Sequence, residues 1–349
     1  MRKKLISLVA MSVFVPSILT GCDTGGGDSS DSSSATNSTT NSTTTATYYG
    51  AASAGDFAEF TFDGKTITYT LEGPVFGNIS GSFPIQIHIQ KPFYKGYEED
   101  TPVYLMLAGN IGFASVYENG KEVLLVGLKE SGSLTEEEIV NKKFIYTTIH
   151  NDLSVANLSI EFNNDKTWKT YDTNGNEVST GSWQLIDGKY INLTDEAGNI
   201  ISKVVIKPGV NRAGFVVDLR DNVGGFGVGL EQKALTKEDI VGTYYYYSYD
   251  NVYDEDCYGI GKVYYDDTTG DYKYTSKTIW CDLPEDIGLE ETGTLVLNEP
   301  ITGMAIATDS KTGYKSSIFL DTEDGYFIAF KYDNNGNIVE YIIGSNKVE

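Results

Sequence analysis

The stretch that decides the fold runs from residue 158 to residue 206 and reads LSIEFNNDKTWKTYDTNGNEVSTGSWQLIDGKYINLTDEAGNIISKVVI. Short runs of alternating apolar and polar residues are separated by the turn-forming pairs Asn163-Asn164, Asn174-Gly175, Asp187-Gly188 and Gly198-Asn199. Asn-Gly and Asp-Gly pairs favour the tight turns of β-hairpins. A turn roughly every 8 to 12 residues is typical of a meander that closes into a barrel or a sandwich.

The same alternation and turn chemistry extend over residues 48–349. Ile67, Tyr69 and Leu71, for example, alternate with threonines soon after the turn pair Asp63-Gly64. Patterns with a helical period are nearly absent. We therefore predict an all-β chain that is built from antiparallel β-barrels or sandwiches.

Two short segments that interrupt the β pattern are copies of each other. Residues 133–146 and 234–247 are identical at six of fourteen aligned positions, and a Val-Gly-Leu triplet precedes each segment. Both place a threonine three residues before an acidic residue, which is the spacing of a helix capping box. An offset near 101 residues is too long for a solenoid repeat and favours tandem domains. We expect three β domains, at residues 48–133, 134–234 and 235–349, with chance similarity as the alternative.

The second and third domains resemble the lipocalin-like (calycin) β-barrel domains of bacterial envelope lipoproteins. The resemblance rests on a short helix that leads into a first strand at residues 240–244, and on the central run from residues 158–162 to 181–185. The first strand of a lipocalin carries Gly-x-Trp, whereas Tyr244 replaces the tryptophan here and Asn141 replaces the glycine in the second domain. The resemblance implies antiparallel barrels and leaves the ligand undefined.

The N-terminus has the pattern of an export signal. Arg2, Lys3 and Lys4 precede an uncharged stretch, which is followed by Leu19-Thr20-Gly21-Cys22. A charged region, an apolar region and small residues before a cleavage site are typical of a secretory signal peptide. The segment resembles a bacterial lipoprotein signal, which implies removal of residues 1–21 and acylation of Cys22 by chains such as palmitate. An ordinary signal peptide or a short membrane anchor is the alternative.

The predicted lipid would anchor the protein to a membrane of the cell envelope. Two or more acyl chains on one residue hold a protein stably in one leaflet. Residues 22–47 combine the lipidated Cys22 with a segment of almost only Ser, Thr, Gly, Asn, Asp and Ala, a composition typical of a flexible, disordered linker. We therefore predict a folded part that is tethered to the outer or the inner membrane, in the periplasm or on the cell surface.

Composition excludes several classes of function. The 349 residues include 49 Asp and Glu against 26 Lys and Arg, which gives a formal net charge of −23. Such a surface is unsuited to nucleic-acid phosphates, so we expect no nucleic-acid partner. Two histidines and three cysteines, without a Cys-x-x-Cys pair, are too few for several metal or redox centres. We predict no cofactor and no metal site.

The most acidic stretch lies in the third domain. Twelve Asp and Glu stand against three Lys between Asp250 and Glu291. Carboxylate clusters of this kind bind Ca²⁺ or form a solvated face. Residues 172–176 and 333–337 resemble calcium loops, but neither has both the Gly and the Glu of an EF-hand, and a hairpin turn explains them with fewer assumptions. We expect an exposed acidic face.

Cys257 and Cys281 are expected to form a disulfide. The residues between them read as one hairpin whose turn carries Gly270. If Asp267 pairs with Asp271, Cys257 lies directly opposite Cys281, within the distance that a disulfide spans. An oxidising location outside the cytoplasm agrees with this pairing. Two separate buried thiols are the alternative.

An aromatic block at residues 244–249 reads Tyr-Tyr-Tyr-Tyr-Ser-Tyr. Alternate side chains of a strand point to opposite faces, so this block places rings inside and outside the predicted barrel. Outward rings could stack on sugars or peptides, whereas the alternative is a barrel wall whose phenols contact water. We name Tyr244, Tyr246 and Tyr249 as candidate ligand-binding residues.

No residue pattern of an enzyme stands out. The sequence lacks a Gly-x-Ser-x-Gly nucleophile motif, and its Gly-rich segment at residues 224–227 runs into a predicted strand. We therefore predict no catalytic residues and a non-catalytic binding or interaction module for a glycan, peptide or protein. The alternatives are a lipocalin-like carrier of a small apolar ligand and, third, an envelope hydrolase. A roomy cavity lined by apolar groups inside a barrel would favour the carrier.

Overall fold

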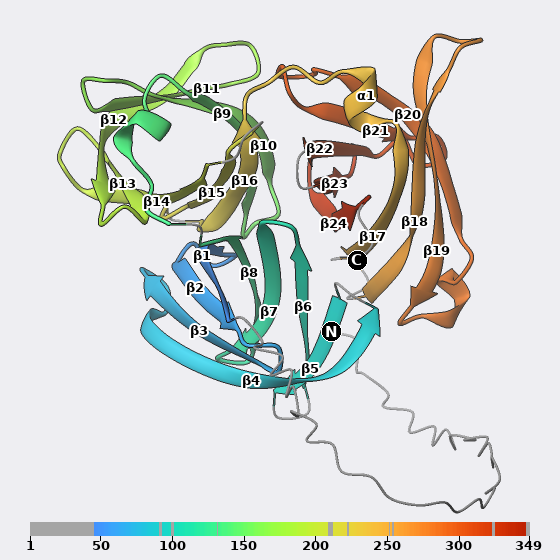
Figure 1. Ribbon diagram of the computed structural model, residues 1–349, viewed down its shortest axis with the longest axis horizontal. Helices are drawn as coiled ribbons and strands as arrows, with labels where there is room; N and C mark the ends of the chain where they lie inside the picture. Colours follow the sequence, from blue (N-terminus) through green and yellow to red (C-terminus); the bar gives the residue numbers. More distant parts are fainter. Residues whose placement is uncertain are drawn as a thin grey trace, which may run out of the picture. The chain divides into compact units, whose positions relative to one another are not determined.

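The structure of the protein, a computed structural model, describes residues 45–90, 93–98, 101–130, 132–208, 212–221, 223–250, 252, 255–322 and 325–346 (Figure 1). The predicted signal peptide of residues 1–21, the predicted lipid attachment site Cys22 and residues 23–44 of the predicted linker lie outside the described residues. The first strand begins at Ala46, so the linker prediction, which ended at residue 47, runs two residues into the fold. None of the helices in the described part has the length and apolar character that crossing a membrane requires.

Strands dominate the described chain and form three closed antiparallel barrels of eight strands each. In every barrel each strand pairs with the next one along the chain, and the last strand pairs with the first. In Figure 1 the strands of the first barrel run from blue to green, those of the second from green to yellow, and those of the third from yellow to red. The predicted all-β fold of tandem antiparallel barrels is confirmed, and each of the three units is a barrel rather than a sandwich.

The strands have the following bounds. Barrel 1 contains β1 (Ala46–Ala52), β2 (Phe57–Phe62), β3 (Thr66–Gly73), β4 (Gly77–Gln90), β5 (Phe93–Glu98), β6 (Thr101–Ala108), β7 (Ile111–Glu118) and β8 (Lys121–Lys129). Barrel 2 contains β9 (Lys143–His150), β10 (Val155–Phe162), β11 (Thr167–Tyr171), β12 (Glu177–Ile186), β13 (Tyr190–Thr194), β14 (Ile200–Lys207), β15 (Gly214–Asp218) and β16 (Gly225–Glu231). Barrel 3 contains β17 (Gly242–Asp250), β18 (Glu255–Asp266), β19 (Asp271–Cys281), β20 (Glu290–Leu297), β21 (Ala305–Asp309), β22 (Lys315–Asp321), β23 (Tyr326–Tyr332) and β24 (Ile338–Ser345).

Short helical segments precede barrels 2 and 3. They are the 3-10 turn η1 (Glu136–Glu138) and the helix α1 (Lys237–Ile240), and a further 3-10 turn, η2 (Pro284–Asp286), follows β19. At the start of α1 the carboxylate of Asp239 accepts hydrogen bonds from the backbone N–H of Thr236 at 2.6 Å and from its hydroxyl at 2.9 Å. Both η1 and α1 have the capping box that the sequence predicts. Ile139, which directly follows η1, packs into the core of barrel 2, and Ile240 of α1 packs into the core of barrel 3.

Three hairpins turn through the same five-residue motif, Asp-x-x-Gly-Asn, at residues 172–176, 195–199 and 333–337. In each motif one aspartate oxygen accepts the backbone N–H of the asparagine and the other accepts its side-chain amide, at distances between 2.8 and 3.2 Å. The glycine has a φ between +83° and +86°, a left-handed conformation that glycine adopts without strain. Two of these motifs are the segments that resemble calcium loops, and in both of them the two carboxylate oxygens serve the turn.

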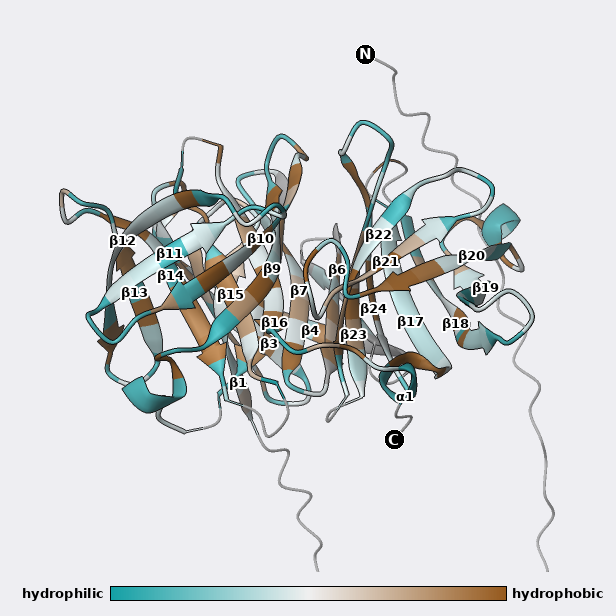
Figure 2. Ribbon diagram, turned by 90° about the horizontal axis from the view of Figure 1, so that it is seen from above, coloured by the Kyte–Doolittle hydropathy of each residue, from teal (hydrophilic) through white to brown (hydrophobic). Residues whose placement is uncertain are grey.

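The interiors of barrels 1 and 2 are filled with apolar side chains. In barrel 1, Tyr48 and Phe60 are stacked with their ring centroids 5.0 Å apart. In barrel 2, Phe144 packs against Phe215 at 5.4 Å, in a cluster that also contains two buried tryptophans. Barrel 3 differs, because its own buried apolar cluster is small and includes Ile240 of α1. Figure 2 accordingly draws β17 in the pale colour of intermediate hydropathy.

A further apolar cluster, which we call the shared core, contains side chains from all three barrels. It includes residues of β7, β16 and β23. Arg212 adds polar contacts, since its guanidinium donates hydrogen bonds to the backbone carbonyls of Leu320 at 2.9 Å and Gly303 at 3.1 Å. Burial lowers the pKa of Arg212 to about 10, which still leaves this side chain charged at neutral pH.

Candidate functional site

The interior of barrel 3 contains a cavity of about 250 Å³ that opens to solvent, which we call the barrel 3 lumen. Every strand of the barrel contributes to its wall, together with residues before β17 and after β19. The charged residues that line it are Asp250, Glu255, Lys262, Asp286, Glu291, Lys331 and Glu340.

Small residues keep this interior open. A Cβ atom at Gly259 would lie 2.6 Å from the hydroxyl of Tyr246, and one at Gly293 would lie 2.4 Å from the ring of Tyr274. The two glycines therefore allow both tyrosine rings to lie against the backbone of neighbouring strands. Short side chains enlarge the same wall at Ala305, Ala307 and Ala329.

One end of the lumen is apolar and lies beside α1. Leu235, Ile240 and Tyr244 are buried there, and the ring of Tyr244 packs edge-on against Phe327 at 5.4 Å. The hydroxyl of Tyr244 donates a hydrogen bond to the carbonyl of Ile240 at 2.9 Å, which fixes the ring beside the helix. Burial raises the pKa of Tyr244 to about 12, and Asp239 adds to this effect.

A buried lysine lies in the wall toward the other end. The ammonium of Lys331 is 2.8 Å from a carboxylate oxygen of Glu291 and 3.2 Å from one of Glu340. Burial alone would lower the pKa of Lys331, but the two carboxylates outweigh burial and hold this pKa above its ordinary value. Burial raises the pKa of Glu340, although Lys331 and a hydrogen bond with Ser248 oppose this effect. The three charged side chains thus form one ion-pair group with a formal net charge of −1.

Phenols add neutral hydrogen-bonding groups to the lumen. Burial raises the pKa of Tyr246, although hydrogen bonds with the side chains of Thr278 and Ser276 oppose this effect. Burial likewise raises the pKa of Tyr274, and the neighbouring carboxylate of Glu291 adds to it. Both tyrosines therefore keep their protons at physiological pH and offer hydroxyl donors and acceptors.

Carboxylates gather at the end of the lumen that lies away from α1. Cross-strand pairing places four charged residues in one row across β23, β24, β17 and β18, namely Lys331, Glu340, Asp250 and Glu255. Glu255 is buried and accepts a hydrogen bond from the backbone N–H of Leu283 at 3.1 Å. Burial raises the pKa of Glu255 to about 7. The neighbouring carboxylates of Asp286 and Asp250 raise this pKa further, whereas the hydrogen bond from the Leu283 N–H lowers it.

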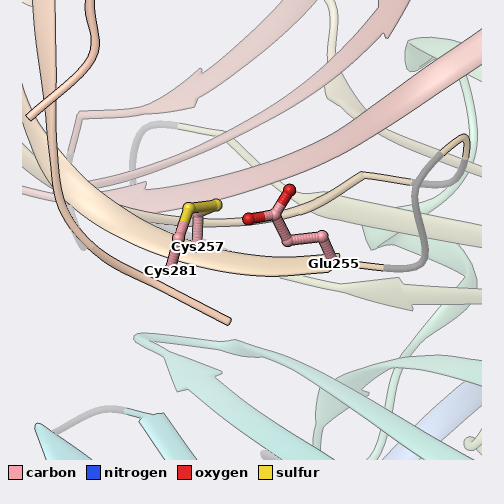
Figure 3. A group of neighbouring side chains, drawn as sticks. All are labelled: Glu255, Cys257 and Cys281. Atoms are coloured by element: carbon pink, nitrogen blue, oxygen red, sulfur yellow. A yellow bond between two sulfur atoms is a disulfide. The ribbon is translucent and has the colours of Figure 1, made fainter. Parts of the chain in front are cut away.

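The predicted disulfide lies in the same wall. Cys257 and Cys281 are directly opposed on β18 and β19 and are joined by a disulfide bond. In Figure 3 the carboxylate of Glu255 points toward this bond, and one of its oxygens lies within 4.8 Å of both sulfur atoms. Because both sulfurs belong to the disulfide, neither offers a thiolate to a metal ion.

The register of the β18–β19 hairpin differs from the prediction near its turn. Asp266, and not Asp267, pairs with Asp271, so the loop contains four residues. A register shift between Tyr258 and Gly259, typical of a β-bulge, moves the pairing by one residue before the cysteines are reached. The two differences cancel, which is why Cys257 and Cys281 still face each other.

The candidate tyrosines are divided between the two faces of β17. Tyr244 and Tyr246 point into the lumen, so they belong to the inward rings of this block and are not available for stacking on the outer surface. Tyr249 points out of the barrel, because residues an odd number of positions apart in a strand face opposite sides. Its ring lies 6.3 Å from that of Tyr341, and both line a second cavity, of about 240 Å³, which also includes residues of barrels 1 and 2. The structure thus brings two of the three candidates together.

The acidic residues of barrel 3 are not confined to an exposed face, which corrects the expectation from charge. Glu255 and Asp309 are buried, and Glu291 and Glu340 line the lumen. Local compensation explains their placement: Asp309, for example, accepts hydrogen bonds from backbone N–H groups of the turn that follows it. None of these residues was predicted from the sequence to belong to a site. One sequence feature could have indicated a buried charged group, namely Lys331 within the otherwise apolar strand β23.

No protein-family model and no curated protein matches the sequence. Among solved structures, the chain is similar to a protein of unknown function from the DUF3598 family of Nostoc punctiforme, with 10% identity over 60% of this chain and 96% of that chain and a TM-score of 0.26. It is also similar to the DNA polymerase III subunit beta of Pseudomonas aeruginosa, with 8% identity over 89% and 94% of the two chains and a TM-score of 0.13. The DNA polymerase sliding clamp of Bacillus subtilis gives 8% identity over 90% and 94%, again with a TM-score of 0.13. These scores are too low to support any statement about function.

Proposed function

We propose that the protein is a non-catalytic binding protein of the cell envelope and that barrel 3 binds a small amphipathic ligand in its lumen. The observation that carries this proposal is the contrast among three barrels of one topology. Barrels 1 and 2 have interiors packed with aromatic and aliphatic side chains, whereas barrel 3 contains a cavity of about 250 Å³ that opens to solvent. Protein interiors are normally close-packed, so an open interior in one of three related barrels favours a role in binding.

The chemistry of the lumen favours an amphipathic ligand over a purely apolar one. Buried charges and polar groups are costly, and apolar residues would fill the same volume with greater stability. Lys331, Glu340 and Glu255 nevertheless occupy the wall, at a distance from the apolar end beside α1. The cavity is also somewhat smaller than the roughly 300 to 1,000 Å³ of sites for drug-sized ligands. A compact molecule with one apolar and one polar part fits these properties.

The envelope location is proposed from the sequence. The segment 19–22 resembles a lipobox, and acylation of Cys22 would place the three barrels outside the cytoplasm. The disulfide between Cys257 and Cys281 agrees with an oxidising compartment. Binding of a glycan, peptide or protein on an outer surface remains the alternative, since Tyr249 faces outward.

A lumen-filling variant tests the proposal. A Cβ atom at Gly261 would have no neighbouring atom closer than 3.8 Å, so Gly261→Trp directs its ring into open space in the lumen. The matched control is Val296→Trp, because Val296 lies in the same barrel with 47% of its surface exposed. Native mass spectrometry of the protein purified from envelopes should show a small bound molecule in the wild type and in the control, and none in Gly261→Trp. Retention of that molecule by Gly261→Trp, or a wild type that carries no small molecule and gains none from a metabolite extract, would contradict binding in the lumen.

A further inference from the structure

The second cavity, which Tyr249 and Tyr341 line, lies where the three barrels meet and opens to solvent; we call it the junction cavity. Among the described residues, none lines both this cavity and the barrel 3 lumen. The two cavities lie on opposite faces of β17 and β18. On β17, Ser248 lines the lumen and Tyr249 the junction cavity, and on β18 the same holds for Glu255 and Asp256. The junction cavity is therefore a separate site, which the proposed function does not use.

Aromatic rings from all three barrels line the junction cavity. The ring centroid of Tyr104, on β6 of barrel 1, lies 6.4 Å from that of Tyr247, on β17 of barrel 3. Phe226, on β16 of barrel 2, lies 6.5 Å from Tyr341, on β24 of barrel 3, and their ring planes differ by 25°. These separations are near the upper end of the range of about 4.5 to 7 Å that is usual for aromatic pairs. The rings thus line the cavity without filling it.

Contacts within the protein hold the walls of the junction cavity in place. Phe113 and Phe226 are buried members of the shared core. Asn151 and Leu153, on the turn between β9 and β10, lie at the mouth, because both are exposed. The carbonyl of Leu153 accepts a hydrogen bond from the backbone N–H of Ile338 at 2.9 Å, which joins this turn to barrel 3. Side chains that are already held in place lose little conformational entropy when a ligand binds.

Polar groups interrupt the aromatic wall. Asp256 is buried in it, and Asn151 carries its amide at the mouth. His150 donates a hydrogen bond from Nδ1 to the carbonyl of Gly224 at 3.2 Å, so the neutral ring keeps Nε2 as an acceptor. A purely apolar ligand would cover such groups without replacing the hydrogen bonds that they make with water, which is costly. The ligand that fits this wall combines an apolar face with groups that donate and accept hydrogen bonds.

The charges around the junction cavity favour a neutral ligand. The described residues that line it include one carboxylate, Asp256, and neither a lysine nor an arginine, so an anion would meet a like charge in the wall. Lys95 lies outside the lining and places its ammonium 4.9 Å from the ring centroid of Tyr104. A cationic ligand on that ring would therefore be repelled by a charge that is already there.

We propose that the junction cavity binds one neutral pyranose ring, either as a free sugar or as the terminal residue of a glycan. This inference goes beyond the proposed function, because it concerns a different ligand at a separate site. The C–H groups on one face of a pyranose pack on aromatic rings, and its hydroxyls both donate and accept hydrogen bonds. A pyranose therefore matches the rings of the wall as well as Asp256 and Asn151.

The size of the junction cavity limits the occupant to a single ring. Its volume of about 240 Å³ is smaller than the roughly 300 to 1,000 Å³ of sites for drug-sized ligands. Any further sugar residue of a glycan would lie outside, beside the exposed Asn151 and Leu153. Because the walls come from three barrels, a bound ring contacts all three at once.

Methyl glycosides test the class of ligand. We suggest those of glucose, galactose, mannose and N-acetylglucosamine as neutral probes, that of glucuronic acid as the anionic probe and that of glucosamine as the cationic probe. Saturation-transfer difference NMR and isothermal titration calorimetry with the full-length mature protein should detect binding of at least one neutral glycoside. The acid is expected not to bind, and the amine is expected to bind at least about tenfold more weakly than the neutral glycoside.

Two further measurements locate the ligand and identify its source. Hydrogen exchange should slow in peptides of β6, of the turn between β9 and β10, and of β17, since each barrel contributes to the wall. An oligosaccharide that ends in the bound sugar should bind more tightly than the methyl glycoside if the source is a glycan, and no more tightly if the source is a free sugar.

Variants assign the binding to named residues. Tyr249→Ala removes a ring of the wall and is expected to weaken sugar binding about tenfold. The matched control is Tyr245→Ala, because Tyr245 lies on the same face of β17 and lines neither cavity. Asn151→Ala removes an exposed amide, so it tests the polar contact even if Tyr249→Ala does not fold, and it is expected to weaken binding at least about threefold. Its control is Asn334→Ala, at an exposed asparagine of another turn.

Several outcomes would overturn the proposal. These are binding of none of the neutral glycosides, equal or tighter binding of a charged probe, and slowed exchange in a single barrel only. Unchanged binding in both Tyr249→Ala and Asn151→Ala would contradict the junction site. Loss of sugar binding in Gly261→Trp but not in Tyr249→Ala would place the sugar in the lumen, which also contradicts the junction site.

Discussion

The substitution Lys331→Met leaves two glutamates in the wall of barrel 3 without their cation. The exposed fractions of the side chains are 10% for Lys331, 17% for Glu340 and 47% for Glu291, so one buried and one half-exposed carboxylate lose a partner. Removal of one member of a buried ion pair costs about 3 to 5 kcal/mol, whereas exposed pairs contribute about 0 to 1 kcal/mol. Because water screens Glu291, we expect the free energy of unfolding to fall by about 2 to 4 kcal/mol at neutral pH.

This loss should depend on pH in a defined direction. Burial already raises the pKa of Glu340, and without the opposing ammonium its pKa in the folded state rises further. A carboxyl whose folded pKa exceeds its unfolded pKa binds more protons in the folded state, so stability decreases as the pH rises between the two values. The deficit of Lys331→Met should therefore be smallest below the ordinary glutamate pKa of about 4.3 and should grow toward neutral pH.

We would measure the free energy of unfolding by urea denaturation and by hydrogen exchange of peptides from β17–β24, detected by mass spectrometry. The second measurement isolates barrel 3, because three barrels need not unfold in one step. Lys277→Met is the matched control, since Lys277 and Glu290 are 60% and 67% exposed, and it should change stability by less than about 0.5 kcal/mol. Adding Glu340→Gln to Lys331→Met should recover part of the loss. A loss below about 1 kcal/mol, or one that does not grow with pH, would refute the view that Lys331 compensates buried charge.

Four further predictions concern other parts of the chain. Cys22→Ala is expected to release the protein from membranes, and its retention after an alkaline carbonate wash would contradict lipid anchoring. Replacement of Cys257 and Cys281 by Ser should lower the free energy of unfolding by about 3 kcal/mol, because the disulfide closes a loop with a sequence separation of 24. Detection of free thiols by alkylation of the unreduced protein would contradict the bond. Asp172, Asp195 and Asp333 each accept hydrogen bonds from the asparagine four residues later, and these bonds hold the pKa of each aspartate below 3.8. The titration midpoints measured by NMR should therefore lie below 3.8. The stability that these turns contribute should be lost as the pH falls through those midpoints. Residues 134–234 and 235–349, expressed separately, should each give dispersed amide spectra, with lower stability than in the full chain because each loses the shared core.

The turns and the strand alternation were predictable because both are local properties. Gly175 and Gly336 stand at left-handed positions, which tight turns require and which glycine adopts without strain. The threonine and the acidic residue of each capping box lie within one helical turn of each other. Such signals depend on neighbours in sequence, so one sequence was sufficient to find the all-β fold.

The lumen was not predictable in the same way, because strand β23 is buried on both faces. Ile328 and Phe330 belong to the shared core, while Ala329 and Lys331 line the lumen. Period-two alternation marks the inner face of a strand only when the other face meets water. Glu340 lies opposite Lys331 in the β23–β24 hairpin, but the other partner, Glu291, comes from β20, and no rule of local sequence connects β20 with β23. The bulge at Tyr258 and Gly259 likewise became evident only from the pairing of two strands.

The shared core has a consequence for how this protein can diverge. Much of the apolar packing that stabilises barrel 3 lies on its outer face, where Phe319, Ile328 and Phe330 pack in a cluster with residues of barrels 1 and 2. A wall that is held from outside tolerates exchange of its uncharged inward residues, because these contribute less to the total stability than the interior of an isolated barrel would. Lys331 is the exception, since it compensates buried charge. If the three barrels arose by gene duplication, barrels 1 and 2 would maintain the shared core, and the binding specificity of barrel 3 could change by substitution of its inward residues. Homologues should accordingly vary most at the uncharged inward positions of β17–β24 and least at the positions of the shared core.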